Sequence, residues 1–262
     1  MDLCELEFNP NWNSKRHPWE RARVKVVMNM LKPIIRNKSG EVNILDIGSG
    51  DAYMVHRLVS ENPNLVAHCV DIEYTDKIVD SLNSQVESKR IKFYKSLEDY
   101  KEANGDLIVD IALFLDVIEH VEDDVALLKL VTELSNVNSS STILITVPAY
   151  QSLFSAHDVF LKHFRRYTVK SLHASTRKAG CDTEKTGYFF FSLYLARRLQ
   201  KIFSGNKEDS QKGISAYKPI FLLDQIFLTI LVLDFHLFKG LSSLGLKFPG
   251  LSCYAICQTE QE

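Results

Sequence analysis

The stretch from residue 42 to residue 52 reads V-N-I-L-D-I-G-S-G-D-A and decides the expected fold. Residues 44 to 47 form a short apolar run of the kind that makes a buried parallel strand. The run stops at Gly48 and Gly50, and a helical pattern resumes at Ala52. A strand, a glycine turn and a helix in this order present a loop to a nucleotide, because glycine lets a ligand approach the backbone. The same glycines would also suit a simple tight turn.

Two later segments strengthen the nucleotide-binding interpretation. A second apolar run, Leu65 to Val70, ends at Asp71, about 20 residues after the glycine turn, where nucleotide-binding α/β domains place an acid that holds ribose hydroxyls. A third apolar run, residues 111 to 115, leads into D-V-I-E-H-V at residues 116 to 121. Parallel sheets bind ligands at the carboxyl ends of their strands. The three segments therefore predict one cofactor site at one edge of a sheet.

These segments resemble motifs of the class I S-adenosylmethionine-dependent methyltransferases. L-D-I-G-S-G-D-A, residues 45 to 52, looks like the first motif of that family, D-x-G-x-G-x-G. Val70-Asp71 looks like its ribose acid, and D-I-A-L-F-L-D-V-I-E-H-V, residues 110 to 121, looks like its fourth motif. The resemblance covers roughly residues 41–190 and the last strand. Ala52 departs from the pattern, since the family most often has a third glycine there.

The resemblance implies an α/β fold with a doubly wound, mostly parallel seven-stranded sheet and helices on both faces. Residues 1–40 are expected to form an N-terminal helical cap, and residues 41–190 and 251–262 the cofactor-binding core. Residues 191–250 are expected to form a helical insertion before the last strand. The implied cofactor is S-adenosyl-L-methionine, the implied product is S-adenosyl-L-homocysteine, and no metal is expected.

The resemblance also implies a set of cofactor-binding residues at the strand ends. By position they are Asp46, Gly48, Ser49, Gly50, Asp71, Ile72, Ser96, Leu97, Asp116, Val117 and His120. Glu119 and His120 would equally suit a structural hydrogen-bonded pair that supports their loop.

Pro18 favours the first turn of a helix that runs to about Ile35. His17 and Trp19 in this segment would either pack the helix on the sheet or form a lid over the cofactor. In the second case an arginine or a histidine from this helix would meet the methionyl carboxylate of the cofactor.

The segment after the fifth predicted strand, residues 149 to 167, is expected to be a long loop that binds the acceptor. A hydroxyl acceptor needs a base, and a histidine oriented by a carboxylate suits that task. His157 with Asp158, or His163, are the candidate catalytic groups. The candidate acceptor-binding residues are Tyr150, Phe154, Arg165, Arg166 and Tyr167.

Other interpretations of this segment remain open. Both histidines would also suit simple contacts with substrate or backbone. Arg165 and Arg166 would hold a phosphate or carboxylate of the acceptor, or lie on a solvated helix-entry face. The run S-A-H-D…H-F-R-R-Y-T resembles a methyltransferase subgroup linked to cell-surface glycan and related biosynthetic pathways.

The insertion contains a basic stretch, residues 197 to 212, and an apolar stretch, residues 220 to 244. Asp224, Asp234 and His236 make the apolar stretch a poor membrane span, because charges are costly at the centre of a bilayer. It is predicted to form an amphipathic helix or helix pair that serves as a lid, a homodimer interface or a peripheral membrane contact.

The overall composition narrows the function. A net charge of −2 argues against a general nucleic-acid binder. The five cysteines are scattered and odd in number, which favours free thiols in a reducing cytoplasm, and Cys253 and Cys257 are predicted to lie in the core. Residues 1 to 13 contain no apolar run typical of a secretory signal. The expected location is cytoplasmic, with peripheral membrane contact as an option.

The sequence therefore predicts methyl transfer from S-adenosylmethionine to the oxygen of a small-molecule, lipid-linked or sugar-linked acceptor. A nicotinamide-dependent oxidoreductase is the rival enzyme, because it shares the glycine loop and the ribose acid. A non-catalytic scaffold that works through residues 191–250 is the rival outside enzymes.

Overall fold

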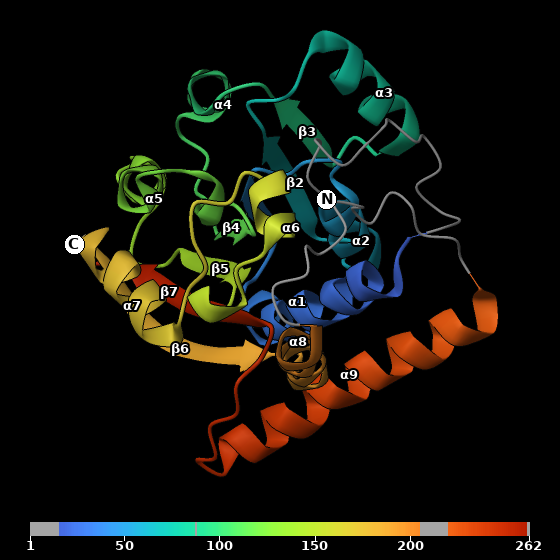
Figure 1. Ribbon diagram of the computed structural model, residues 1–262. Helices are drawn as coiled ribbons and strands as arrows, with labels where there is room; N and C mark the ends of the chain where they lie inside the picture. The colour runs from blue at the N-terminus through green and yellow to red at the C-terminus, as the bar shows by residue number, and fades with distance from the viewer. Residues whose placement is uncertain (1–15, 87, 205–219, 261–262) are drawn as a thin grey trace.

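The computed structural model describes residues 16–86, 88–204 and 220–260 (Figure 1). Expectations for residues 1–15 and 205–219 lie outside the described part. The described chain forms one seven-stranded sheet in the order β3-β2-β1-β4-β5-β7-β6. The strands pair in parallel except at β7, which is antiparallel to both β5 and β6. The predicted doubly wound, mostly parallel sheet is thus confirmed.

Three of the strands, β1, β2 and β4, match the three predicted apolar runs. The seven strands of the sheet are β1 (Val42–Ile47), β2 (Leu65–Val70), β3 (Ile91–Tyr94), β4 (Ile111–Leu115), β5 (Thr142–Pro148), β6 (Cys181–Phe189) and β7 (Ser252–Thr259). The central strands β1, β4 and β5 are buried on both faces, which is why they read as nearly continuous apolar runs. Cys253 and Cys257 are buried in β7, as predicted.

Helices cover both faces of the sheet. The longer ones are α1 (Pro18–Arg36), α2 (Tyr53–Glu61), α3 (Asp76–Val86), α4 (Leu97–Asn104), α5 (Asp124–Thr132), α7 (Val169–Lys178), α8 (Phe191–Ser204) and α9 (Phe221–Ser243), and the short ones are η2 (Ile118–His120), η3 (Gln151–Leu153) and α6 (Ala156–Phe160). One core cluster joins α1, α2, α3 and α9 to the sheet, and the other joins α4, α5 and α7 to it. This arrangement confirms helices on both faces.

Two helices arise where the sequence did not predict them. Ser96 accepts a hydrogen bond from the Asp99 N–H at 3.0 Å and so caps α4. Ser155 and Asp158 form a capping box that starts α6 inside the segment predicted to be a long loop. The acceptor segment is therefore more ordered than its sequence suggested.

The N-terminal helix begins with a cap made by His17. Its Nδ1 accepts the Trp19 N–H at 3.1 Å, and Glu20 accepts the His17 N–H at 3.3 Å. Pro18 occupies the first turn, where no backbone donor is lost. The helix packs against α9 along one face of the domain, where Figure 1 shows the two helices side by side. This confirms the helix predicted over residues 18 to 35.

The insertion is docked on the domain through α9. Asp234 lies on the buried side of α9, and its carboxylate accepts the N–H groups of Phe191 at 3.0 Å and Ser192 at 2.8 Å. Asp234 thereby caps α8 from another helix. The outward side of α9 carries an apolar stripe whose members are 49–67% exposed: Leu222, Ile226, Ile230, Leu233 and Leu237.

Candidate active site

The glycine loop after β1 is tightly turned and packed. Gly48 and Gly50 have φ angles of +66° and +54°, a region that favours glycine. A Cβ at Gly48 would lie 2.8 Å from Cγ2 of Val117, so the loop after β1 touches the loop after β4. Ala52 also has a positive φ of +54°, which explains why a glycine is usual at this position in the family it resembles.

The end of β2 braces that loop. Asp71 accepts the Gly50 N–H at 2.8 Å through one oxygen and the Glu73 N–H at 2.9 Å through the other. The Tyr74 hydroxyl donates to the Gly50 carbonyl at 2.8 Å. Next to Asp71, the side chain of Ile72 is 88% exposed. An acidic side chain and an exposed apolar side chain thus lie beside the glycine loop.

Asp46 lies in β1, two residues before Gly48, and is buried. No hydrogen-bond donor from the described residues reaches its Oδ1. Burial raises the pKa of this carboxyl to about 7, and the negative charge of Asp71 adds to the shift. A buried carboxyl oxygen without a partner needs an explanation. A donor group on a ligand in the loop, such as the amino group of the methionyl part of the cofactor, would supply one.

The start of α1 covers the same loop. Arg16 forms an ion pair with buried Asp51, and its guanidinium lies 4.5 Å from the ring centroid of Tyr53. Further along α1, Arg23 lies 3.0 Å from the carboxylate of Asp116, at the end of β4. The helix is therefore tied to two strand ends, which fits the predicted N-terminal cap.

Ser96 and Leu97, the residues predicted to contact adenine, lie directly after β3. Ser96 uses its hydroxyl to cap α4, and Leu97 packs into the core cluster below that helix. The predicted acceptor residue Phe154 follows η3 and is half-buried. These positions agree with the predicted edge of the sheet.

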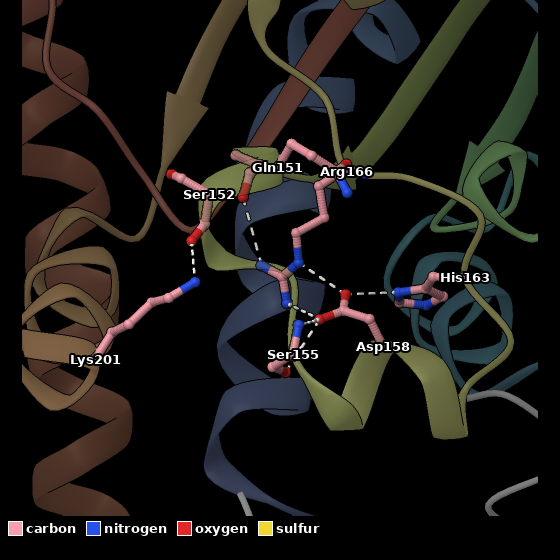
Figure 2. A network of polar contacts seen from close by, with 8 residues as sticks. Gln151, Ser152, Ser155, Asp158, His163, Arg166 and Lys201 are labelled. Carbon is pink, nitrogen blue, oxygen red and sulfur yellow. Dashed lines mark hydrogen bonds and ion pairs between the residues drawn. The ribbon is translucent and has the colours of Figure 1, made fainter. Parts of the chain in front are cut away.

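In the acceptor segment, Asp158 organises the neighbouring side chains (Figure 2). It is fully buried, and Arg166 donates to both of its oxygens, at 2.7 and 3.0 Å. Nδ1 of His163 lies 2.9 Å from Oδ1 of the same carboxylate. Although burial opposes it, hydrogen bonds from His163 and Arg166 hold the pKa of Asp158 well below its usual range. Asp158 is therefore a carboxylate that orients two cationic or polar partners.

The two candidate histidines differ in their contacts with Asp158. Asp158 takes His163, five residues on, as its imidazole partner rather than its sequence neighbour His157. His157 stacks on Phe160, with ring centroids 6.4 Å apart, and burial lowers its pKa. The carboxylate-oriented imidazole of this segment is thus His163.

Three predicted acceptor contacts have structural partners instead. Arg166 is bound to Asp158, and Arg165 lies 3.4 Å from the carboxylate of Asp124 at the start of α5. Tyr167 is 2% exposed, and its hydroxyl donates to Asp124 at 2.8 Å. In the structure each of these side chains fastens the segment to a neighbouring element.

An aromatic wall that the sequence analysis missed flanks this segment. Tyr150 stacks on Tyr188 from β6, with ring centroids 5.1 Å apart, and packs at an interplanar angle of 49° against Tyr194 from α8, with the same centroid separation. Only Tyr150 was predicted as an acceptor contact. The other two lie on elements far away in the sequence, so no local pattern joined them to the site.

Glu119 and His120 of η2 meet His163 from the acceptor segment. Glu119 is fully buried, and neither of its carboxylate oxygens has a hydrogen-bond partner among the described residues. Burial raises its pKa well above the usual range, and the charge of Asp116 adds to this. The rings of His120 and His163 meet edge to face, with centroids 4.6 Å apart. The structural hydrogen-bonded pair of Glu119 with His120 is therefore not what this loop contains.

The geometry can be compared with solved structures. A SAM-dependent methyltransferase from Archaeoglobus fulgidus is 18% identical, with 92% of this chain and 97% of that chain covered and a TM-score of 0.51. This chain has a methyltransferase fold. The methyltransferase domain of bacterial CtHen1-C shares this methyltransferase fold at 13% identity, with 92% and 98% coverage and a TM-score of 0.54.

The methyltransferase fold does not by itself name the reaction. The [4+2]-cyclase SpnF is similar at 13% identity, with 95% of this chain and 85% of that chain covered and a TM-score of 0.55. One fold commonly hosts several chemistries. No protein-family model and no curated protein matches the sequence. The activity must therefore be argued from the side chains at the site.

Proposed function

We propose that the protein transfers a methyl group from S-adenosylmethionine to the oxygen of a small-molecule, lipid-linked or sugar-linked acceptor. One observation carries the proposal. The glycine loop, the braced Asp71 and the Asp46 oxygen that has no donor among the described residues meet at the carboxyl edge of β1 and β2. That arrangement suits a ligand with ribose hydroxyls and a charged amino acid part.

Different residues around the loop bind different parts of the cofactor. Asp71 faces the ribose, Asp46 and the backbone of residues 48 to 50 take the methionyl part, and Ile72, Ser96 and Leu97 take the adenine. Asp116, Val117 and His120 complete the wall at the end of β4. When bound, S-adenosylmethionine supplies an electrophilic methyl group on a sulfonium; the protein supplies position and electrostatics.

Methylation of a hydroxyl acceptor releases the hydroxyl proton, and a group near the acceptor must accept it. The acceptor oxygen bonds to the methyl carbon as the carbon–sulfur bond breaks, the electron pair stays on sulfur, and the hydroxyl proton leaves. Because Asp158 is a carboxylate, Nδ1 of His163 carries the hydrogen and Nε2 keeps a lone pair. That lone pair would either accept the proton or ligate a cation that acidifies the hydroxyl.

The insertion supports a lipid-linked acceptor at a membrane surface. The outward stripe of α9 leaves five large apolar side chains exposed, and such patches mark interaction sites. A cleft of about 1130 Å³ between α1, α2 and α9 is lined by six arginines and lysines and two acidic residues, namely Arg16, Arg21, Lys25, Lys32, Arg36 and Arg57 with Glu61 and Asp224. An apolar stripe beside a basic cleft suits an anionic lipid surface.

α9 is also long and apolar enough to cross a membrane by length and composition. Its packing on α1 and the capping of α8 by Asp234 favour a helix that lies along the surface instead. We therefore propose a cytoplasmic protein with peripheral membrane contact.

Calorimetric titration with S-adenosylmethionine, S-adenosylhomocysteine and NAD tests the cofactor. Saturable binding of the first two and not of NAD is the expected result. Binding of NAD alone would favour an oxidoreductase. Binding of the first two without methyl transfer to any hydroxylated lipid or sugar would leave the scaffold as the better interpretation.

A further inference from the structure

Three potential metal ligands meet where η2 faces the acceptor segment. One carboxylate oxygen of Glu119 and one ring nitrogen each of His120 and His163 all lie within 4.8 Å of one another. We propose that these residues bind one divalent transition-metal ion. The site lies beside Asp116 and Val117, at the predicted cofactor edge of the sheet.

Glu119 is the first reason for this proposal. Its side chain is fully buried, and the described residues offer neither oxygen a hydrogen-bond donor. Buried carboxyl groups are normally hydrogen-bonded, paired with a charge or bound to a metal. The neighbouring acids already have partners, since Arg23 pairs with Asp116 and Arg166 pairs with Asp158. Glu119 thus has both carboxylate oxygens available for a cation among the described residues, whereas Asp46 has one oxygen without a donor.

His163 is the second reason. Its Nδ1 lies against Asp158, which fixes the ring and leaves Nε2 as the nitrogen with a free electron pair. Metal-binding histidines usually hold a carboxylate in this way with their other nitrogen. Figure 2 shows Asp158 itself held between Arg166 and His163, so the supporting partner is also fixed. The side chain of His163 is only 8% exposed, which limits competition from water.

The ligand set indicates the class of ion. One carboxylate and two imidazoles suit zinc, iron, manganese or cobalt, whereas calcium and magnesium prefer oxygen ligands alone. Three protein ligands leave coordination positions open for oxygens of another molecule. The sequence analysis expected no metal, because the motif D-V-I-E-H suited a cofactor loop or a structural hydrogen-bonded pair of Glu119 with His120.

The ion has a natural use in methyl transfer, and this part rests on the proposed function. A bound divalent cation orients an acceptor hydroxyl and lowers its pKa, so that the oxygen attacks as the stronger nucleophile. Nε2 of His163 is then a ligand, and the acidified hydroxyl releases its proton to solvent or to the buffer. The metal site itself does not depend on this role.

Cobalt(II) is a convenient probe, because it absorbs visible light when it is bound by imidazole. The full chain is stripped with EDTA, dialysed and titrated with Co²⁺ in the absence of S-adenosylmethionine, by absorbance and by calorimetry. One saturable site is expected. Glu119→Gln and His120→Ala should each weaken Co²⁺ binding by more than the roughly 10–100-fold typical of losing a supporting partner. Mg²⁺ should compete weakly.

His173→Ala is the matched control, because His173 is exposed on α7, away from the cluster. It should bind Co²⁺ as the unchanged chain does. Circular dichroism of each variant establishes that it folds, and His120→Ala keeps the test valid if Glu119→Gln does not fold, since His120 is only partly buried. Absence of saturable Co²⁺ binding, or equal binding by Glu119→Gln and His173→Ala, overturns the site. Co²⁺ binding without S-adenosylmethionine binding would keep the metal site and reject the proposed function.

Discussion

Asp158 Oδ1 lies 2.9 Å from Nδ1 of His163, while Arg166 holds both oxygens of the same carboxylate. One buried carboxylate thus joins the two halves of the acceptor segment, α6 and the strand-like run that ends at Tyr167. It also decides which nitrogen of His163 faces the loop after β4. Asp158 therefore affects both the stability of the fold and the orientation of His163, and substitutions can separate these two effects.

Asp158→Asn should lower the free energy of unfolding by about 3–5 kcal/mol at pH 7, because Arg166 is left as a buried charge without its partner. Urea unfolding measures the loss. Asp182→Asn, at an exposed carboxylate of β6, should stay within about 0.5 kcal/mol of the unchanged chain.

The pKa of Asp158 is depressed in the folded protein. Its stabilisation is therefore present above the unfolded pKa of about 3.9 and is lost as the pH falls through the lower folded value.

Asp71→Asn should weaken S-adenosylmethionine binding by roughly 10–100-fold, the range expected for one charge-assisted hydrogen bond. The amide keeps one acceptor for the Gly50 N–H but loses the charge that faces the ribose. Glu73→Gln is the control, since Glu73 is an exposed carboxylate two residues further on. Calorimetry gives both affinities. Equal affinities for the two variants would remove Asp71 from the cofactor site.

Asp46 makes the stability of the free protein depend on pH. Its folded pKa of about 7 lies above the unfolded value, so the folded state binds more protons between about pH 4 and 7. Stability therefore falls as the pH rises through that window and levels off above it. Asp46→Asn should remove this decline and make the free chain more stable at pH 8, by on the order of 2–4 kcal/mol, while weakening cofactor binding. Unfolding curves at pH 5 and pH 8 provide the comparison. An equal effect of the substitution at both pH values would contradict this account.

Ala52→Gly should leave stability nearly unchanged. A glycine relieves about 1–2 kcal/mol of strain at the positive φ of Ala52, but it removes a buried methyl group worth about 0.8 kcal/mol and adds about 0.4–1 kcal/mol of freedom to the unfolded chain. These terms nearly cancel. Ala174→Gly, on the exposed side of α7, should cost about 1 kcal/mol with no strain to relieve. If Ala52→Gly instead costs as much as Ala174→Gly, the strain at Ala52 is negligible.

The double variant Ile226→Ser/Ile230→Ser should bind anionic vesicles about tenfold more weakly or worse, because two members of the outward stripe of α9 are lost. Ile108→Ser/Leu130→Ser removes two similarly exposed apolar side chains from other elements and should bind as before. Sedimentation with vesicles of phosphatidylglycerol, and with phosphatidylcholine for contrast, gives the partition. A concentration-dependent dimer that the stripe variant abolishes, without vesicle binding, would identify a second copy as the partner of this face.

Much of the fold was predictable because it depends on local patterns. The apolar runs of β1, β2 and β4, the turn at Gly48 and the cap at Thr168 are all encoded within a few neighbouring residues. The cofactor edge followed from strand order alone. Side-chain partners were not predictable in this way. His157 and His163 both lie within five residues of Asp158 in the sequence. Only the path of the chain after α6 places His163, and not His157, against its carboxylate.

The same limit explains the other differences at the site. Arg165 and Tyr167 look free in the sequence because their partner, Asp124, lies in another helix. Tyr188 and Tyr194 enter the aromatic wall from β6 and α8. The cluster of Glu119, His120 and His163 joins two segments that one strand and one helix separate along the chain. Contacts of this kind need the packed structure before they can be recognised.

The position of β7 has a consequence for how the chain is made. β7 lies between β5 and β6, yet the ribosome completes it after both α8 and α9. During synthesis β6 has no strand to join, and the apolar side chains of α9 emerge before the sheet can close. The nascent chain therefore passes through an interval in which a lipid surface or a chaperone competes with the unfinished sheet for α9. Insertion of β7 ends that competition and commits the helix to its place beside α1.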